Sequence, residues 1–450
     1  MMLKEENHVI VMEGNWSALQ AARDIVASGT QEEPFYVCDL RELEARHARW
    51  RDLMPRVEPF YAVKCNDDKL LLRTLAALGT GFDCASRGEI DLVTNLGVAP
   101  DRIIFANPSK MPSQIRYAAG VCVDIMTVDS EVELIKIKEN MPHAQLVLRI
   151  RCDSTHAQLS FGPRFGCDPE TDAPALLKLA AALDLDVIGV SFHVGTDARE
   201  YDAYARAIAL CRDVFAVAAK MGRRMRLVDI GGGFPGDTGT SIKEVAAVVN
   251  AALDTHFPDR GVRVIAEPGR YFAAAAYTLA VMVHGKRDIK SEDGEVHTMY
   301  SITDGVYGSF NSVITVNEKV EPMLLYPSDE EPQLCSIWGP SCCPLDCVMP
   351  AASLPPLQVG SWLLFKDMGA YTRSITTHFN GFTAARVKTL VDRRLWSVLK
   401  EQSPFSECQF SVGRAAPPSL PCAAGAVCDP AERHAVFVDA SCSSNEGYRE

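Results

Sequence analysis

Lysine, histidine and glutamate side chains stand at the ends of three short apolar runs of this sequence. Lys64 follows PFYAV, His193 ends VIGVSFH and Glu267 ends RVIAE. A lysine amine that is partly removed from water has a lowered pKa and can form a Schiff base with a carbonyl compound. Taken alone, Lys64 is more simply a surface lysine at a strand end and His193 a satisfied core residue, so their placement in the fold has to decide.

A glycine run follows the apolar segment RLVDI and consists of Gly231, Gly232 and Gly233. Backbone amides in such a run can approach an anion closely, although the spacing differs from that of a dinucleotide-binding fingerprint. Further along, Arg270 suits a phosphate, and the acid Glu267 suits a pyridine nitrogen that must stay protonated. A glycine turn alone is weak support, and a structural salt bridge explains Glu267 and Arg270 equally well.

Two cysteines and a tyrosine stand out in the second half of the chain. Cys342 and Cys343 are adjacent in WGPSCCPLD, and Tyr371 lies in DMGAYT. The cysteines lack a C-x-x-C pair with matching histidines, so the spacing does not indicate a zinc site. From spacing alone, inert loop thiols are the simpler interpretation.

Eight short apolar runs between residues 55 and 270 are spaced so that a helix fits between each pair. This pattern predicts βα units, and eight parallel strands predict a closed (β/α)8 barrel. Barrel active sites lie at the carboxyl ends of the strands, and phosphate often binds after strands seven and eight. The chemical residues above lie at those ends. The runs are 59–63, 81–84, 102–106, 122–127, 146–151, 187–193, 226–230 and 263–267.

Helix signals support the same interpretation. Ser130 and Glu133 form a capping-box pattern, and an apolar stripe recurs over 245–253. The pattern changes after residue 275 to short β segments separated by Gly, Pro and charged loops, which predicts an antiparallel β-sandwich domain.

The expected domains follow from these changes of pattern. They are an N-terminal segment that joins the β domain (1–36), the barrel (37–275), the β domain (276–400) and a poorly ordered tail rich in Ser, Pro, Ala and Cys (401–450).

Composition excludes several classes of protein. With 450 residues, 47% hydrophobic residues and a formal charge of −13, the chain is typical of a globular protein that does not bind nucleic acid. No apolar run is long enough to span a membrane, and the first residues lack the apolar core of a secretory signal. We therefore expect a cytosolic protein in which most of the 15 cysteines are reduced core residues.

Taken together, the motifs resemble the ornithine decarboxylase family, the fold-type III pyridoxal-phosphate enzymes. FYAVKCN, GFDCAS, SFHVG, DIGGGFPG, AEPGR, DGVYGSF, WGPSC and GAYT occur in family order between residues 35 and 400. The resemblance implies an alanine racemase-like fold, pyridoxal 5'-phosphate as cofactor, and decarboxylation of a small-molecule amino-acid substrate.

The resemblance also implies a role for each residue that stands at a motif position. Lys64 would hold the cofactor as a Schiff base with Asp83 nearby, His193 would stack on the ring, and Glu267 would pair with its nitrogen. The phosphate would be held by Gly231, Gly232, Gly233, Arg270, Tyr371 and Thr196.

The family forms head-to-tail homodimers with shared active sites. Cys342 would reach across the interface to protonate the substrate carbanion, Arg164 and Asp346 would form an intersubunit salt bridge, and a monomer should be inactive.

Four positions depart from the family pattern. Ornithine-specific members have acids where this chain has Val316 and Cys343, and the usual Ser-Gly near the phosphate is here Thr196 with Asp197. A buried substrate ammonium without a counter-charge costs several kcal/mol, so ornithine should bind poorly. An aliphatic side chain suits a valine-and-thiol pocket, at ~0.8 kcal/mol for each buried CH₂. Asp197 adds a negative charge that should weaken cofactor binding.

These departures favour leucine as the substrate, followed by isoleucine, methionine or valine. Two alternatives stay open: an ornithine decarboxylase that uses another acid, and an inactive regulatory protein of the antizyme-inhibitor type. The segment that matches the family's antizyme-binding stretch keeps Arg116 and Lys136, so antizyme is a further candidate partner.

Overall fold

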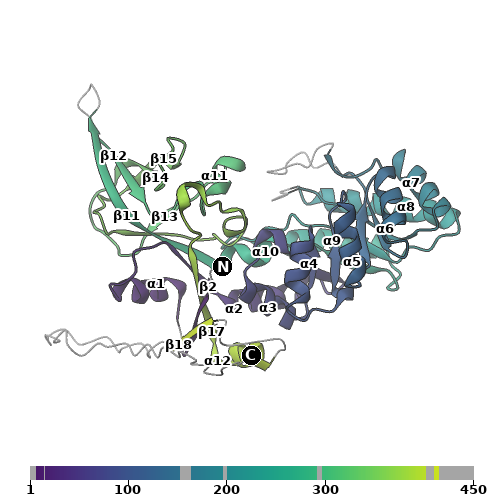
Figure 1. The fold of residues 1–450 in the computed structure, drawn as a ribbon, viewed down its shortest axis with the longest axis horizontal. Helices are drawn as coiled ribbons and strands as arrows, with labels where there is room; N and C mark the ends of the chain where they lie inside the picture. The colour runs from purple at the N-terminus through teal and green to yellow at the C-terminus, as the bar shows by residue number, and fades with distance from the viewer. Residues whose placement is uncertain are drawn as a thin grey trace, which may run out of the picture.

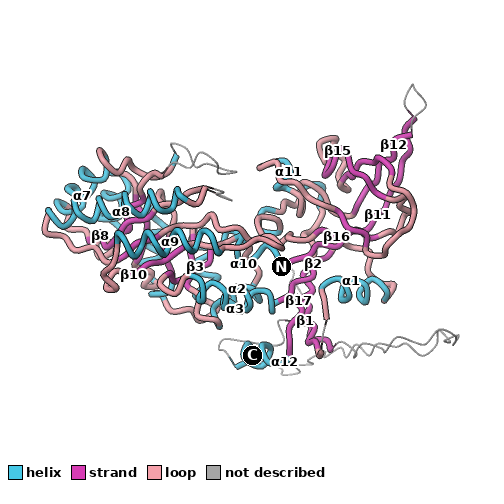
Figure 2. Tube along the Cα trace, turned by 180° about the vertical axis from the view of Figure 1, so that it is seen from behind, coloured by secondary structure: helices cyan, strands magenta, loops and turns pink. Residues whose placement is uncertain are grey.

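The computed structural model describes residues 7–14, 16–152, 164–195, 200–290, 296–401 and 410–414. Figure 1 shows a barrel surrounded by helices on one side of the molecule and a part rich in β-strands on the other, and Figure 2 shows the same division from behind. In the part of the chain that the structure describes, no helix is both long and apolar enough to cross a lipid bilayer.

Eight parallel strands close into a barrel, in which β10 pairs with both β9 and β3. Each strand overlaps one of the eight predicted runs, so the prediction of a (β/α)8 barrel is confirmed. The strands are β3 (Val57–Ala62), β4 (Gly81–Cys84), β5 (Ile103–Phe105), β6 (Ile125–Val128), β7 (Gln145–Arg149), β8 (Asp186–Ser191), β9 (Leu227–Asp229) and β10 (Arg263–Ala266).

The strands are apolar on both faces because both faces are covered. Bulky side chains fill the barrel interior as one buried cluster, and the outer side chains join the main core under the helices. The interior cluster includes Phe60, Ile104, Val147, Ile188, Leu227 and Ile265. The strands are therefore held rigidly, and their carboxyl ends form a fixed rim.

Seven helices that follow these strands lie around the barrel: α3 (Lys69–Ala77), α4 (Arg87–Thr94), α5 (Pro112–Gly120), α6 (Glu131–Asn140), α7 (Asp172–Ala182), α8 (Asp202–Lys220) and α9 (Lys243–His256). The predicted stripe of α9 is confirmed, since Val245, Val249 and Leu253 are buried. The predicted capping box of α6 is wrong in its contacts: Ser130 is the N-cap but makes no side-chain cap bond. Glu133 instead pairs with the buried amine of Lys110 at 2.8 Å.

The second domain is one ten-stranded sheet. Its strands are β1 (Asn7–Met12), β2 (Phe35–Asp39), β11 (Tyr277–Lys290), β12 (Val296–Ile302), β13 (Pro322–Leu324), β14 (Gln333–Trp338), β15 (Cys347–Leu354), β16 (Trp362–Phe365), β17 (Arg386–Asp392) and β18 (Phe410–Arg414). Its helices are α1 (Ala18–Ala27), α11 (Asn311–Thr315) and α12 (Arg393–Glu401).

This sheet differs from the purely antiparallel domain that the sequence suggested. β11 is antiparallel to its neighbours β2, β12 and β16, but β1 and β17 run parallel to each other, as do β12 and β14. The expectation of a tail without structure also fails for β18, which pairs with β1. Strand pairing between distant segments supplies the partners that local composition does not reveal.

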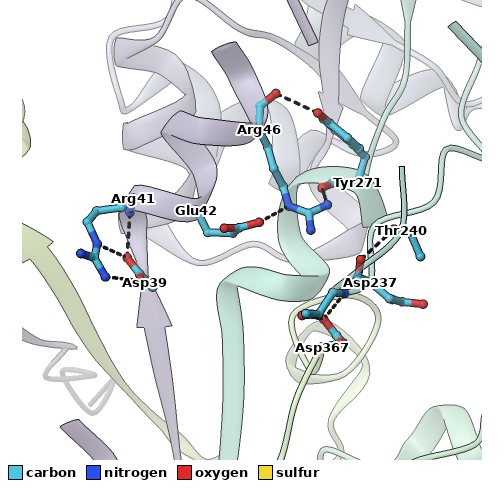
Figure 3. A network of polar contacts seen from close by, with 9 residues as sticks. Asp39, Arg41, Glu42, Arg46, Asp237, Thr240, Tyr271 and Asp367 are labelled. Atoms are coloured by element: carbon cyan, nitrogen blue, oxygen red, sulfur yellow. Dashed lines mark hydrogen bonds and ion pairs between the residues drawn. The ribbon is translucent and has the colours of Figure 1, made fainter. Parts of the chain in front are cut away.

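Polar contacts within the barrel domain and between the two domains hold the barrel mouth in place (Figure 3). Arg46, on α2 (Leu40–Leu53), donates to the backbone oxygen of Tyr271 at 2.6 Å, and the Tyr271 hydroxyl donates back to the Arg46 backbone oxygen at 2.9 Å. Asp367 of the sheet domain accepts two bonds of 2.7 Å from Thr238, just beyond the glycine run. Since Tyr271 lies on α10 (Arg270–Ala273), these contacts fix the loops after β9 and β10.

Candidate active site

The predicted chemical side chains meet at the carboxyl ends of the barrel strands. Lys64 lies in the short turn Val63–Cys65 directly after β3, and Asp83 lies within the neighbouring β4. The Lys64 amine donates to Asp83 Oδ2 at 2.5 Å, and the Asp83 side chain is fully buried whereas 40% of the Lys64 side chain is exposed. The lysine is therefore anchored at its tip but open to a ligand in the barrel mouth.

The electrostatic setting of Lys64 differs from the sequence expectation. Burial by itself lowers the pKa of Lys64, but the carboxylates of Asp83 and Glu267 outweigh burial and raise this pKa above its ordinary value. The expected lowered pKa is therefore wrong for the chain as it stands, because the acids on neighbouring strands were not considered. Without a carbonyl partner, Lys64 is held as an ammonium ion.

Glu267 has a second buried acid, Asp229, as its neighbour. Glu267 follows β10, and burial together with the charges of Asp229 and Asp83 raises the pKa of Glu267 well above its usual range. Burial likewise raises the pKa of Asp229, at the end of β9, to about 6. Two buried carboxyls this close disfavour a double negative charge, so the pair retains a proton near neutral pH.

His193 follows β8 and presents a neutral ring. Burial, with the positive charges of Arg149 and Lys64, lowers the pKa of His193 well below its ordinary value. Its Nδ1 accepts a bond of 3.0 Å from the backbone N–H of Gly195, which fixes the orientation of the ring. A neutral, oriented imidazole is suited to contact a planar ligand face.

The glycine run after β9 is closely packed. Gly231 and Gly233 have positive φ values of 64° and 100°, which favour glycine. A Cβ at Gly232 would lie 2.9 Å from His193 Nε2, and one at Gly233 would lie 2.6 Å from the Gly195 oxygen. Glycine is thus required both by the backbone conformation and by the close approach of the loop after β8.

Arg270 and Tyr371 lie beside one another, as predicted for a phosphate site. The guanidinium carbon lies 5.8 Å from the centre of the Tyr371 ring, and the Tyr371 backbone N–H donates to the Cys65 oxygen at 2.9 Å, next to Lys64. Arg270 also has acidic neighbours that sequence inspection missed. Its Nη1 lies 2.9 Å from Glu318 Oε1 and 3.8 Å from Asp237 Oδ1.

The comparison with known proteins identifies the family of the chain. Residues 40–274 match the family model for the pyridoxal binding domain of pyridoxal-dependent decarboxylases. The chain belongs to this family. It is a pyridoxal-phosphate-dependent amino-acid decarboxylase, related to enzymes that act on ornithine, arginine and lysine.

Individual relatives cover both parts of the decarboxylase. Ornithine decarboxylase of Rattus norvegicus is 46% identical over 390 residues, which cover 84% of each chain. Antizyme inhibitor 2 of Xenopus laevis is 44% identical over 413 residues, or 88% of this chain and 90% of that one. The structure of the Paramecium bursaria Chlorella virus arginine decarboxylase bound to agmatine superposes with a TM-score of 0.79 at 38% identity, covering 82% of this chain and 100% of that one.

The residues at the barrel mouth fit pyridoxal phosphate. An accessible amine, a buried acid and a neutral imidazole suit the aldehyde, the ring nitrogen and the ring face, and Arg270 keeps its buried Nε without a partner among the described residues. The glycine run leaves no room for a side chain at the predicted phosphate position. The ion pairs of Arg270 with Glu318 and with Asp237 are features that a phosphate site does not call for.

The predicted thiols and specificity residues lie on the other domain. Cys342 is exposed in the loop after β14, where its backbone N–H donates to Asn380 Oδ1 at 3.0 Å. The Cys343 thiol lies 3.0 Å from the Tyr307 hydroxyl, and Val316 is the half-buried residue that directly follows α11. No hydrogen bond or ion pair joins these side chains to Lys64 within the part of the chain that the structure describes.

Two further predictions concern the interface and the phosphate. Arg164 is exposed, whereas Asp346 is buried and accepts bonds from the backbone N–H groups of Val306 at 2.8 Å and Ser341 at 3.0 Å. Within one subunit Asp346 therefore shapes the cysteine loop, and its intersubunit pairing with Arg164 stays a prediction. Thr196 and Asp197 lie outside the described residues.

Asp229 and Glu318 are the site residues that sequence reasoning missed. Asp229 is the last residue of β9, so the rule that barrel chemistry lies at strand ends could have found it. Glu318 stands in a loop of the sheet domain and becomes a neighbour of Arg270 only through the packing of the two domains. No local pattern marks it.

Proposed function

We propose that this decarboxylase acts on an L-amino acid with an apolar aliphatic side chain, leucine first, and releases the corresponding amine and carbon dioxide. The observation that carries the proposal is the pair Val316 and Cys343, which replace the two acids of ornithine-specific members. Both side chains are half-buried, and Cys343 is occupied by its contact with Tyr307.

The energetic argument is one of unbalanced charge. A distal substrate ammonium in a site without its counter-charges loses hydration and gains no ion pair, at a cost of several kcal/mol. Each CH₂ of an aliphatic side chain gains ~0.8 kcal/mol on burial. The acid nearest in sequence to Val316 is Glu318, and its Oε1 is already bound to Arg270. Leucine is therefore favoured over ornithine.

The geometry supports the following roles. Lys64 holds the cofactor and is oriented by Asp83, His193 contacts the ring face, and Glu267 keeps a proton at the ring nitrogen. When bound, the cofactor ring takes up the electrons that remain when carbon dioxide leaves.

The remaining roles complete the phosphate site and the proton delivery. The glycine run, Arg270 and Tyr371 bind the phosphate, with Thr196 as a further donor. Cys342 of the partner subunit donates the proton to the α-carbon in a homodimer whose active sites are shared.

The test is carbon dioxide release by purified protein with added pyridoxal phosphate. Leucine, isoleucine, methionine, valine, ornithine, lysine and arginine are compared side by side, with Lys64→Ala as the inactive control. Turnover of leucine or its neighbours, with little from ornithine, supports the proposal. Preference for a basic amino acid overturns the substrate assignment and leaves the decarboxylase class intact.

A regulatory function is the second candidate, because antizyme inhibitor 2 of Xenopus laevis is 44% identical to this chain. The preserved cluster of Lys64, Asp83, Glu267 and Arg270 favours the enzyme, since a binding protein has no need of it. Absence of the absorbance band of bound cofactor, with no turnover of any substrate, would favour the regulatory function. Antizyme binding is a separate question that a pull-down with Arg116→Ala and Lys136→Ala variants addresses.

A further inference from the structure

Arg270 already has an anionic partner at the position where the phosphate should bind. Its Nη1 donates to Glu318 Oε1 at 2.9 Å, and only 8% of the Arg270 side chain is exposed. The Glu318 side chain is 22% exposed, and its buried Oε2 has no hydrogen-bond partner among the described residues. The carboxylate is thus held by the guanidinium alone.

A backbone hydrogen bond fixes the position of Glu318. Its N–H donates to the backbone oxygen of Ser312 at 3.2 Å, and Ser312 is buried on α11. The preceding Asn317 adopts a left-handed conformation with φ of 54°. The same turn begins at Val316, so the counter-ion of Arg270 and the predicted specificity residue share one short loop.

We propose that Glu318 is a resident competitor of the cofactor phosphate, which lowers the affinity of this decarboxylase for pyridoxal phosphate. The phosphate dianion and the Glu318 carboxylate both require Arg270, and like charges a few ångströms apart repel strongly at a partly buried site. Binding of the phosphate must therefore separate Glu318 from Arg270 or leave an unbalanced anion beside it. The proposal concerns cofactor affinity and is independent of which amino acid is the substrate.

The test measures cofactor binding to the apoprotein without substrate, by titration with pyridoxal phosphate and absorbance of the bound form. The variant Glu318→Gln keeps the shape of the side chain and removes its charge. The matched control is Glu321→Gln, an exposed acid three residues further along the same segment. We expect Glu318→Gln to lower the dissociation constant roughly tenfold, a difference that high salt reduces, and the control to leave it unchanged.

Binding of a second ligand, pyridoxal, separates the contribution of the phosphate to affinity from that of the ring. Pyridoxal has the same ring and aldehyde but no phosphate, so its affinity should be the same for the wild-type protein and for Glu318→Gln. A gain that appears equally with pyridoxal would show that the substitution acts on the ring site, and it would overturn the proposal. Equal or weaker pyridoxal-phosphate binding by Glu318→Gln would overturn it as well.

A double substitution guards against an indirect effect. In the Arg270→Met background the two anions no longer compete for the guanidinium and only their direct repulsion remains, so Glu318→Gln should tighten binding of pyridoxal phosphate by clearly less than in the wild-type background. Persistence of the full gain without Arg270 contradicts competition for that side chain. Thermal unfolding of each apoprotein establishes that the variants compared are folded.

Discussion

The amine of Lys64 lies 2.5 Å from Oδ2 of Asp83, so the side chain proposed to hold the cofactor is first held as an ammonium ion. Only the neutral amine can attack an aldehyde, and Asp83 raises the pKa of Lys64. The acid that orients the lysine therefore also delays its reaction with the cofactor until the proton is removed.

Asp83→Asn should move the pH dependence of cofactor attachment to lower pH. An opposite charge at this distance favours the charged amine, so removing the carboxylate lowers the pKa of Lys64. The rate of cofactor attachment should therefore reach half of its maximum at a pH roughly one unit lower than in the wild-type protein. The measurement is the rate at which the bound-cofactor absorbance appears after mixing the apoprotein with pyridoxal phosphate at a series of pH values. The exposed Asp101→Asn should keep the wild-type profile; an unchanged profile for Asp83→Asn would refute the assignment.

Ala substitutions at Gly233 and Gly239 distinguish the effect of close packing from the effect of backbone strain. Both have positive φ, 100° and 83°, but a Cβ at Gly233 meets the Gly195 oxygen at 2.6 Å, whereas one at Gly239 meets nothing within 4 Å. Each Ala substitution should lose about 1–2 kcal/mol of stability from the left-handed backbone. Only Gly233→Ala should in addition weaken pyridoxal-phosphate binding, since the loop after β8 must move. Equal cofactor affinities of the two variants would contradict a role of this turn in the site.

The barrel and most of its mouth could be predicted from the sequence, because a parallel strand buried on both faces leaves a distinct apolar run. Lys64, His193 and Glu267 follow such runs directly, so their meeting at one rim was a consequence of topology. The pKa shifts of the site residues could not be predicted in the same way. The pKa of Lys64 depends on Asp83 and Glu267 on other strands, and its direction was therefore predicted wrongly.

The second domain shows where local pattern stops being informative. The hydrophobic pattern of a strand reports how many of its faces are buried and does not by itself give the direction of each neighbour, so the parallel pairs of β1 with β17 and of β12 with β14 left no signal. β18 lies in a segment of low apolar content and is placed by pairing with β1. The contact of Glu318 with Arg270 likewise arises only when the two domains pack together.

Arg46→Met should destabilise the packing of α2 against α10. Arg46 is buried, and its loss leaves the buried backbone oxygen of Tyr271 without its donor and Glu42 without its ion-pair partner. An orphaned buried acceptor costs about 1–3 kcal/mol, so the urea midpoint of the apoprotein should fall accordingly. Arg51→Met on the exposed face of the same helix should change stability by less than about 0.5 kcal/mol. Equal effects of the two substitutions would show that the contacts of Arg46 with Tyr271 and Glu42 do not stabilise the protein.

The position of Cys342 allows a direct test of the shared active site. This thiol is exposed on the sheet domain, and its loop makes its contacts with Asn380 of that same domain. If each site takes Lys64 from one chain and Cys342 from the other, Lys64→Ala and Cys342→Ala homodimers should each be nearly inactive.

Mixing the two variants should restore activity, because a mixed dimer has one site with both residues intact and one site with neither. With random exchange, half of the dimers are mixed, so the mixture should recover about a quarter of the wild-type rate of carbon dioxide release. Co-purification through two different affinity tags isolates the mixed dimer. This dimer should show about half of the wild-type rate of carbon dioxide release. If the two residues belonged to one chain, the mixed dimer would contain only defective sites and mixing would restore nothing. A recovered rate therefore requires Cys342 to act across the interface, whatever the substrate.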